Sequence, residues 1–143
     1  MKVIICGAGQ VGWQIARHLA SERNSVTIVD SNAELVRRAA DTLDVQGVTG
    51  FASYPDVLER AGARDADMLI GCAAADETNL VACKIAHDLF SVSTTIARLR
   101  SPEFAADSRL MATSGFAVQE VICPEASVTA MVSKLIDYPQ ALQ

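Results

Sequence analysis

Short apolar runs alternate along the chain with stretches in which apolar residues recur every three or four positions. Continuous apolar runs are typical of parallel strands covered on both faces, and the helical spacing between them predicts amphipathic helices. This alternation predicts an α/β fold: a doubly wound Rossmann fold with a parallel six-stranded sheet of order 3-2-1-4-5-6 and helices on both faces. The predicted strands are at 3–5, 26–29, 45–49, 67–72, 94–98 and 119–123.

The first strand runs directly into a glycine-rich turn and then into a helix. Gly7 permits the tight turn, Gly9 lets a pyrophosphate approach the backbone, and Gly12 lets helix and strand pack closely. The unpaired amides at the start of the helix, together with its dipole, favour phosphate. The turn therefore predicts a nucleotide site, although a glycine-rich loop without a ligand is the alternative. Its residues are Gly7, Ala8, Gly9, Gln10, Val11 and Gly12.

The second strand ends at Asp30, eighteen residues after Gly12. An acidic residue at this distance accepts hydrogen bonds from the ribose hydroxyls and repels a 2′-phosphate, which favours NAD(H) or a plain adenine nucleotide over NADP(H). The alternative is that Asp30 only precedes the next helix, which Ser31 or Asn32 would cap.

Loops after the other strands complete the predicted crevice, because strands one and four meet at the switch point of this topology. Residues 73–75 are three alanines that offer backbone contacts, and Asp76 is expected to cap the following helix. Phe51 either covers the adenine or packs in a core or interface. Arg98 either pairs with phosphate or lies on the surface, and Lys84 is expected to face phosphate or solvent.

Composition narrows the classes of function. The 143 residues fit one domain, and a net charge of −5 with a pI near 4.9 argues against a nucleic-acid or anionic-membrane surface. No apolar run is long enough for a membrane span, and no signal peptide is evident, so a cytosolic protein is expected. The four cysteines lack zinc-site spacing; Cys6 and Cys72 follow strands that are predicted neighbours, and a redox pair there is less favoured than two buried thiols.

Several blocks of sequence resemble the TrkA family of Trk potassium-uptake regulatory proteins. Besides the glycine turn and Asp30, they are DADML at 65–69, DETNLVAC at 76–83, IARLRSPE at 96–103 and ICPE at 122–125. The resemblance covers essentially the whole chain. It implies a cytosolic RCK (KTN) domain with a Rossmann fold at 1–123, followed at 124–143 by a crossover or linker helix that leads to a further carboxy-terminal domain.

The resemblance also implies a regulatory subunit and not an enzyme. NAD(H), ATP or ADP in the crevice would gate a membrane-embedded potassium transporter of the Trk type, which would hold the protein at the inner face of the cell membrane. The implied nucleotide contacts are the glycine turn for phosphates, Asp30 for ribose, Gly50 and Phe51 beside adenine, Ala73, Ala74 and Ala75 on the opposite wall, and Arg98 for phosphate. Ser31 and Asn79 complete the expected set of nucleotide-binding residues.

The last helix raises the question of partners. Its apolar stripe has no further strand to pack against, so we expect a homo-oligomer or a further domain, and the chain to be the amino-terminal part of a longer polypeptide. The stripe consists of Val128, Met131, Val132, Leu135 and Ile136. The alternative function is an NAD-dependent oxidoreductase fragment without its catalytic domain, but no histidine, lysine or tyrosine is expected at the nicotinamide end. A scaffold with a decayed site is disfavoured by the three glycines and Asp30.

Overall fold

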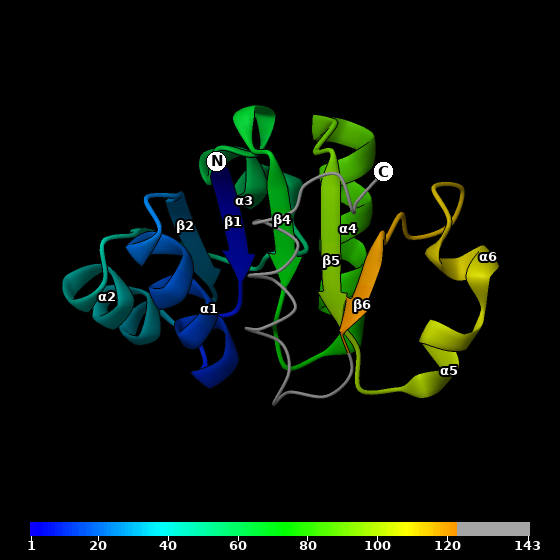
Figure 1. Cartoon of the computed structure of the whole chain (residues 1–143), viewed down its shortest axis with the longest axis horizontal. Coiled ribbons are helices and arrows are strands. Elements are labelled where there is room, and N and C mark those ends of the chain that lie inside the picture. The colour runs from blue at the N-terminus through cyan, green and yellow to red at the C-terminus, as the bar shows by residue number, and fades with distance from the viewer. Residues whose placement is uncertain (123–143) are drawn as a thin grey trace.

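The six predicted strands form one parallel sheet of order β3-β2-β1-β4-β5-β6 in the computed structural model, which describes residues 1–122 (Figure 1). All five strand pairs are parallel, as the continuous apolar runs predict. The predicted fold class is therefore confirmed. The strands are β1 (Lys2–Cys6), β2 (Ser25–Asp30), β3 (Gln46–Thr49), β4 (Met68–Gly71), β5 (Thr94–Arg98) and β6 (Glu120–Ile122).

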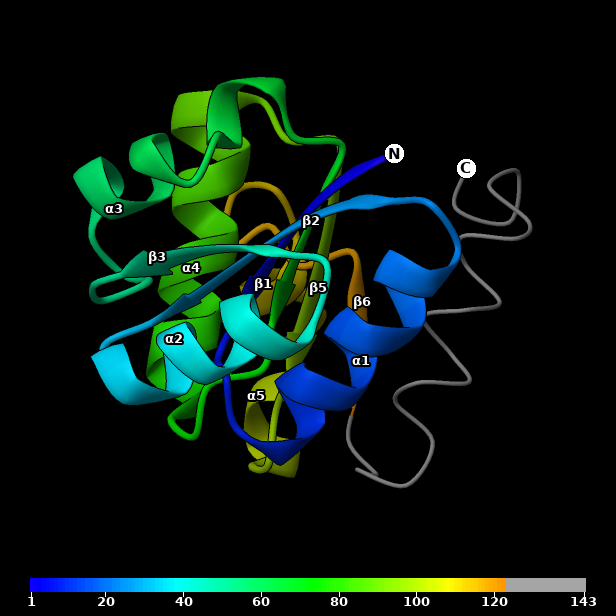
Figure 2. The same ribbon diagram turned by 90° about the vertical axis from the view of Figure 1, so that its left-hand side faces the viewer.

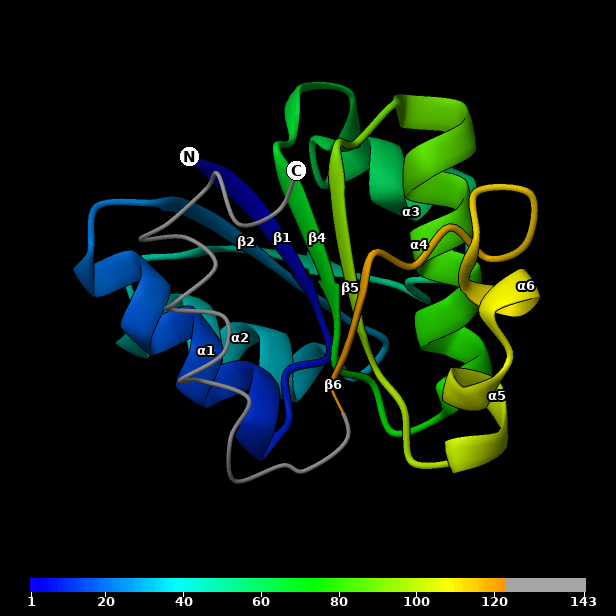
Figure 3. The ribbon, with the colours of Figure 1, turned by 45° about the vertical axis from the view of Figure 1, so that its right-hand side comes forward.

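Helices cover both faces of the sheet. Helices α1 and α2 lie on one face, and α3, α4, α5 and α6 lie on the other (Figures 2 and 3). Their bounds are α1 (Gln10–Ser21), α2 (Ala33–Thr42), α3 (Pro55–Arg60), α4 (Asp76–Phe90), α5 (Pro102–Ala106) and α6 (Ser108–Met111), with a 3-10 turn at Ala63–Asp65.

The two faces of β1 belong to two separate cores. Val3 and Ile5 pack with residues of α1 and α2, whereas Ile4 and Cys6 pack with residues of α3 and α4. All four side chains are at most 1% exposed. Successive side chains of a strand point to opposite faces, so an unbroken apolar run is what a strand covered on both sides requires.

The direction of winding changes at β1. Cys6 pairs with Val29 of β2 on one side and with Gly71 of β4 on the other. The chain leaves β1 for α1 on one face and leaves β4 for α4 on the opposite face. The loops after these two strands therefore diverge at the same edge of the sheet, which is where such folds bind ligands.

The segment between β5 and β6 differs from what its sequence predicts. Ser101 and Pro102 are typical of a helix start and Gly115 of a helix end, which predicts one helix between them, but the structure has the two short helices α5 and α6. Asp107 separates them, because its carboxylate accepts a hydrogen bond from the Arg109 amide and caps α6. A side chain that bonds to the backbone in this way competes with continuation of the preceding helix.

Two predictions fall outside the described residues. These are the apolar last helix and linker at 124–143, and the environment of Cys123. Within residues 1–122, no helix has the length and apolar character needed to cross a membrane.

Candidate functional site

The glycine turn places its three glycines in different surroundings. Gly7 has a φ of +115°, and a Cβ atom there would lie 2.8 Å from backbone atoms of Cys72 and Ala73. A Cβ atom on Gly12 would lie 1.8 Å from the Gly7 carbonyl oxygen. A Cβ atom on Gly9 would meet nothing within 4 Å, so this position faces open space. Gly7 and Gly12 are thus required by the fold, whereas Gly9 leaves room for a ligand.

Helix α1 begins directly after this turn. Gly9 occupies the N-cap position without a side-chain cap, and the first turn contains no acidic residue. The first amides of a helix lack intrahelical acceptors and attract negative charge. This end of α1 is therefore suited to a phosphate group.

Asp30 ties the end of β2 to the glycine turn. Its Oδ2 accepts a hydrogen bond of 2.8 Å from the Ala8 amide, and its Oδ1 accepts one of 2.8 Å from the Asn32 amide. Each carboxylate oxygen can accept one more hydrogen bond, so a ribose hydroxyl can still bind. Asn32 caps α2 through the Glu34 and Leu35 amides, which leaves the Asp30 carboxylate to the crevice.

Asn79 shapes the opposite wall from within. The side chain is 0% exposed; its Oδ1 accepts from the Ala73 amide at 2.8 Å, and its Nδ2 donates to the carbonyl oxygens of Ala73 at 3.0 Å and Arg98 at 2.9 Å. These bonds use both N–H groups and one lone pair of the side-chain amide. Asn79 was predicted as part of the binding set, and the structure places it behind the wall, where it holds the loop after β4 against the end of β5.

Asp76 was expected to cap α4, and this expectation is wrong. Asp76 is the first residue of the helix, and the N-cap position is Ala75, which has no side-chain cap. The Asp76 carboxylate instead accepts hydrogen bonds of 2.9 Å from the amides of Arg100 and Ser101. The carboxylate at the start of α4 therefore fixes the loop that follows β5.

Arg98 lies inside the crevice wall and not on the surface. It is 6% exposed, and its Nη2 donates to the Ala73 carbonyl oxygen at 3.2 Å. The alternative of a solvated surface arginine is therefore excluded. Lys84 was expected to face phosphate or solvent, but its ammonium group contacts the Thr113 carbonyl oxygen and Asp88, each at 2.9 Å.

Two adjoining cavities, which we call the crevice, lie at this edge of the sheet. One of about 350 Å³ lies between the glycine turn and Arg98, and the other, of about 300 Å³, lies between Ser31 and Thr78. Both are lined by Gly7, Asp30, Ala73 and Ala74. The predicted residues that line the crevice are Gly7, Gly9, Gln10, Val11, Asp30, Ser31, Phe51, Ala73, Ala74, Ala75 and Arg98.

The other four predicted residues do not line the crevice directly. Ala8 and Gly12 belong to the turn, Asn79 lies behind the wall, and Gly50 donates its amide to the Asp30 carbonyl oxygen at 2.9 Å. The prediction missed Thr78, although its place in the first turn of α4 after the three alanines would have indicated it.

An aromatic pair lies at one end of the crevice. Phe51 is 56% and Tyr54 53% exposed, and their ring centroids are 5.3 Å apart at an angle of 45°. Phe51 lines the crevice, so of its two predicted roles the core role is excluded.

The thiols near the crevice are buried and free. Cys6, Cys72 and Cys83 form no disulfide, so the pair considered for Cys6 and Cys72 is not present. Burial raises the pKa of Cys72 and of Cys83 to about 12. The thiolate is the reactive form, so these groups are poor nucleophiles. Residues 1–122 contain no cluster of His, Cys, Asp and Glu that could hold a metal ion.

This topology, glycine turn and crevice define the Rossmann class of nucleotide-binding domains. The chain belongs to the TrkA-N domain family, whose model matches residues 3–124. The expected family is thus confirmed.

Curated bacterial proteins that share one name match the whole chain. The Trk system potassium uptake protein TrkA of Vibrio alginolyticus is 49% identical over 144 aligned positions, which cover 100% of this chain and 31% of that protein. The protein of this name from Halomonas elongata is 46% identical, again over 100% of this chain and 31% of its own length. The chain therefore spans about a third of the curated relatives it matches.

Solved structures share the fold at low sequence identity. The TrkA-N domain of the inner membrane protein YbaL from Escherichia coli has a TM-score of 0.76 and 16% identity, covering 94% of this chain and 95% of that one. A Shewanella denitrificans Kef carboxy-terminal domain in an AMP-bound form has a TM-score of 0.72 and 23% identity, covering 99% and 82%. The GsuK channel bound to NAD has a TM-score of 0.70 and 19% identity, covering 85% and 21%.

Proposed function

We propose that this chain is the nucleotide-binding regulatory part of a potassium-uptake system, and that NAD(H), ATP or ADP binds in its crevice. The observation that carries the proposal is Asp30, whose carboxylate is held at the glycine turn by the Ala8 amide with one acceptor site left on each oxygen. Arg98 lines the same crevice and supplies positive charge for the phosphates.

The names of the curated relatives support the potassium-uptake part of this proposal. A nucleotide can regulate only if its affinity differs between two states of the assembly. We propose that those states are arrangements of a homo-oligomer joined through residues 124–143, and that a Trk-type transporter holds the assembly at the inner face of the membrane. The apolar stripe in that segment of the sequence supports such contacts.

A regulatory role fits the crevice better than catalysis. Its described lining residues include arginines, alanines and the carboxylate of Asp30. They also include Cys72, whose thiol has a pKa raised to about 12. A hydride-transfer enzyme needs an acid or base at the nicotinamide end. We therefore propose that the chain is not an enzyme; oxidation of NADH by the protein in the presence of a metabolite would contradict this.

The first test is calorimetric titration of the protein with NADH, NADPH, ATP and ADP, repeated on the Asp30→Ala variant. Loss of a charged acceptor for the ribose hydroxyls should cost about 1.5–3 kcal/mol, which is roughly a tenfold to hundredfold loss of affinity. NADPH should bind more weakly than NADH to the parent protein, because Asp30 repels the 2′-phosphate.

The matched control is Asp44→Ala, which removes an exposed carboxylate that does not line the crevice. Its affinity for each nucleotide should equal that of the parent. An equal change of affinity in both variants, with both folded, would mean that Asp30 acts only through overall charge. Potassium flux that is indifferent to NADH, ATP and ADP in the reconstituted transporter would contradict the regulatory proposal.

A further inference from the structure

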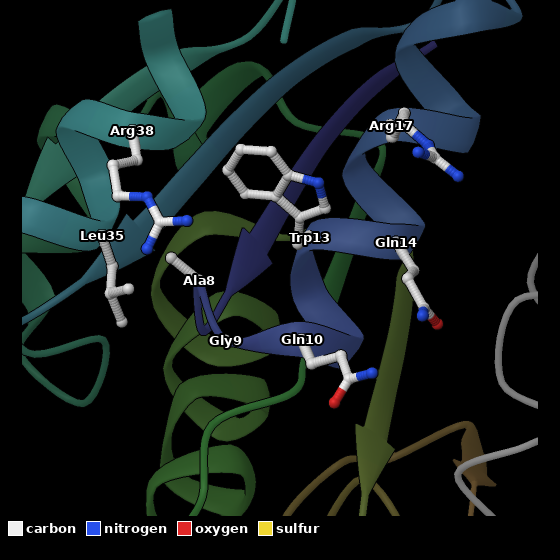
Figure 4. A pocket seen from close by; sticks show the side chains of 8 residues that line it. All are labelled: Ala8, Gly9, Gln10, Trp13, Gln14, Arg17, Leu35 and Arg38. Atoms are coloured by element: carbon white, nitrogen blue, oxygen red, sulfur yellow. The ribbon is translucent and has the colours of Figure 1, made fainter. Parts of the chain in front are cut away.

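Helices α1 and α2 enclose a second cavity, which we call the α1–α2 pocket (Figure 4). It has a volume of about 360 Å³, within the range of small-molecule sites. It adjoins the crevice at Gly9, Gln10 and Leu35 but is not lined by Asp30 or Arg98. The residues that line it are Ala8, Gly9, Gln10, Trp13, Gln14, Arg17, Leu35 and Arg38.

The side chains around this pocket combine one aromatic surface with two cations. In Figure 4 the indole of Trp13 lies between the side chains of Arg38, from α2, and Arg17, from α1. Gln10 and Gln14 add amide groups along the same side of α1, and Leu35 adds an apolar surface.

The positive charge of the pocket is not neutralised locally. Among the described residues, no acidic residue lines it, and no ion pair or hydrogen bond involves the guanidinium group of Arg17 or of Arg38. Two acidic residues at the ends of these helices pair with other residues, Glu34 with Arg37 and Glu22 with His18. The net charge of the chain is −5, so the overall charge does not attract an anion. An anion would be attracted to this pocket by its local arginines.

We propose that the α1–α2 pocket is a second ligand site, which takes a small molecule that joins a flat aromatic ring to a phosphate group, as a purine mononucleotide does. The ring would pack on the Trp13 indole and Leu35, since aromatic faces stack on one another. The phosphate would pair with Arg17 or Arg38, which lie on opposite sides of the indole, because guanidinium groups bind phosphate bidentately. Neither contact uses the Asp30 side chain, and the pocket meets the crevice at Gly9, Gln10 and Leu35.

Trp13 provides the test, because it is the single tryptophan of the 143-residue chain. We would titrate the protein with AMP and record the indole fluorescence. The result expected is a saturable change, with AMP binding more tightly than adenosine or inorganic phosphate, which each carry one of the two groups. The same titration on Phe51→Ala should give an unchanged affinity, since Phe51 lines the crevice and not the α1–α2 pocket.

Substitution of both arginines identifies the site. The Arg17→Gln and Arg38→Gln double variant should bind AMP at least tenfold more weakly. The matched control is Arg37→Gln, which removes a neighbouring arginine of α2 that pairs with Glu34 and does not line the pocket; it should bind AMP as the parent does. Thermal melts verify that each variant is folded.

Three results would overturn this inference. They are an absence of any saturable fluorescence change with AMP, a loss of the change in Phe51→Ala, and its survival at full affinity in the double variant. Failure of NADH to bind in the crevice contradicts the proposed function alone, since the AMP titration reports on the α1–α2 pocket.

Discussion

Gly9 and Gly12 belong to one turn but have different requirements for space. A methyl group on Gly12 would collide with the Gly7 carbonyl oxygen, which is backbone and cannot rotate away. A methyl group on Gly9 would enter open space, and the φ of −75° and ψ of −165° of Gly9 suit any residue. Gly12 is therefore required for the packing of the fold, and Gly9 leaves space for a ligand.

This difference predicts opposite outcomes for two alanine substitutions. Gly12→Ala should lower the free energy of unfolding by about 3 kcal/mol or more, because the clash forces helix and strand apart. Gly9→Ala should stay within about 1 kcal/mol of the parent, yet bind NADH about tenfold more weakly, since its methyl group occupies the space that a pyrophosphate needs. Chemical denaturation and calorimetry measure the two effects. Full NADH affinity in Gly9→Ala would contradict the assignment.

Because the thiols are buried, we predict that they react slowly with thiol reagents and that the stability of the protein depends on pH. In a Cys123→Ser background, Cys6, Cys72 and Cys83 should not react with a thiol reagent at mildly alkaline pH until the protein unfolds. The raised folded-state pKa of Cys72 means that its contribution to stability is complete below its ordinary pKa of 9.0 and is lost as the pH rises towards 12. Rapid labelling of the native protein would show that these thiols are accessible.

At the scale of elements, the first turn of α4 organises both loops of the crevice wall. Asp76 holds the loop after β5 through the Arg100 and Ser101 amides, and Asn79 holds the loop after β4 through Ala73. Both side chains are buried, at 9% and 0% exposure. Helix α4 has no side-chain cap at its first turn, and its polar residues Asp76 and Asn79 bind the neighbouring loops instead.

Asp76→Asn tests this arrangement. An amide has one acceptor oxygen, so it can satisfy only one of the two backbone amides, and the variant should lose about 1–3 kcal/mol of stability. Hydrogen exchange should accelerate at Arg100 and Ser101 and stay unchanged at Leu35. The control is Glu77→Gln, a neighbouring acid of α4 for which residues 1–122 provide no hydrogen bond. Unchanged exchange at Arg100 would contradict the role of Asp76.

The sequence allowed the strands and the glycine turn to be predicted because both depend on local pattern. Val3 and Ile4 point to opposite faces of β1 and are both apolar because both faces are covered, and Gly7 and Gly12 lie within one short motif. The partners of Asp76 are 24 and 25 residues away, and periodicity carries no information about such contacts. The burial of Arg98 likewise depends on packing against the Ala73 loop.

At the scale of the whole molecule, the crevice joins the two halves of the sheet. Asp30 and Ser31 follow β2, and Phe51 follows β3, whereas Ala73 follows β4 and Arg98 ends β5. A nucleotide held by residues of both halves would stabilise the native state as a unit.

NADH at 100 times its dissociation constant should therefore raise the free energy of unfolding by about 2.7 kcal/mol. The measurement is thermal or chemical denaturation with and without ligand, with Asp30→Ala expected to show little change at the same concentration. Hydrogen exchange should slow on both sides of the crevice. Protection confined to the loops after β1 and β2 would mean that the ligand does not span the two halves.

Helix α4 also connects distant parts of the molecule. Its first turn holds both loops of the crevice wall, and Lys84, two turns further on, holds the Thr113 carbonyl oxygen in the segment before β6. The two loops cannot shift independently while these bonds persist. If a bound nucleotide shifts either loop, we therefore expect α4 and the segment before β6 to shift with it, so that a change at the crevice is passed to residues tens of positions away along the chain.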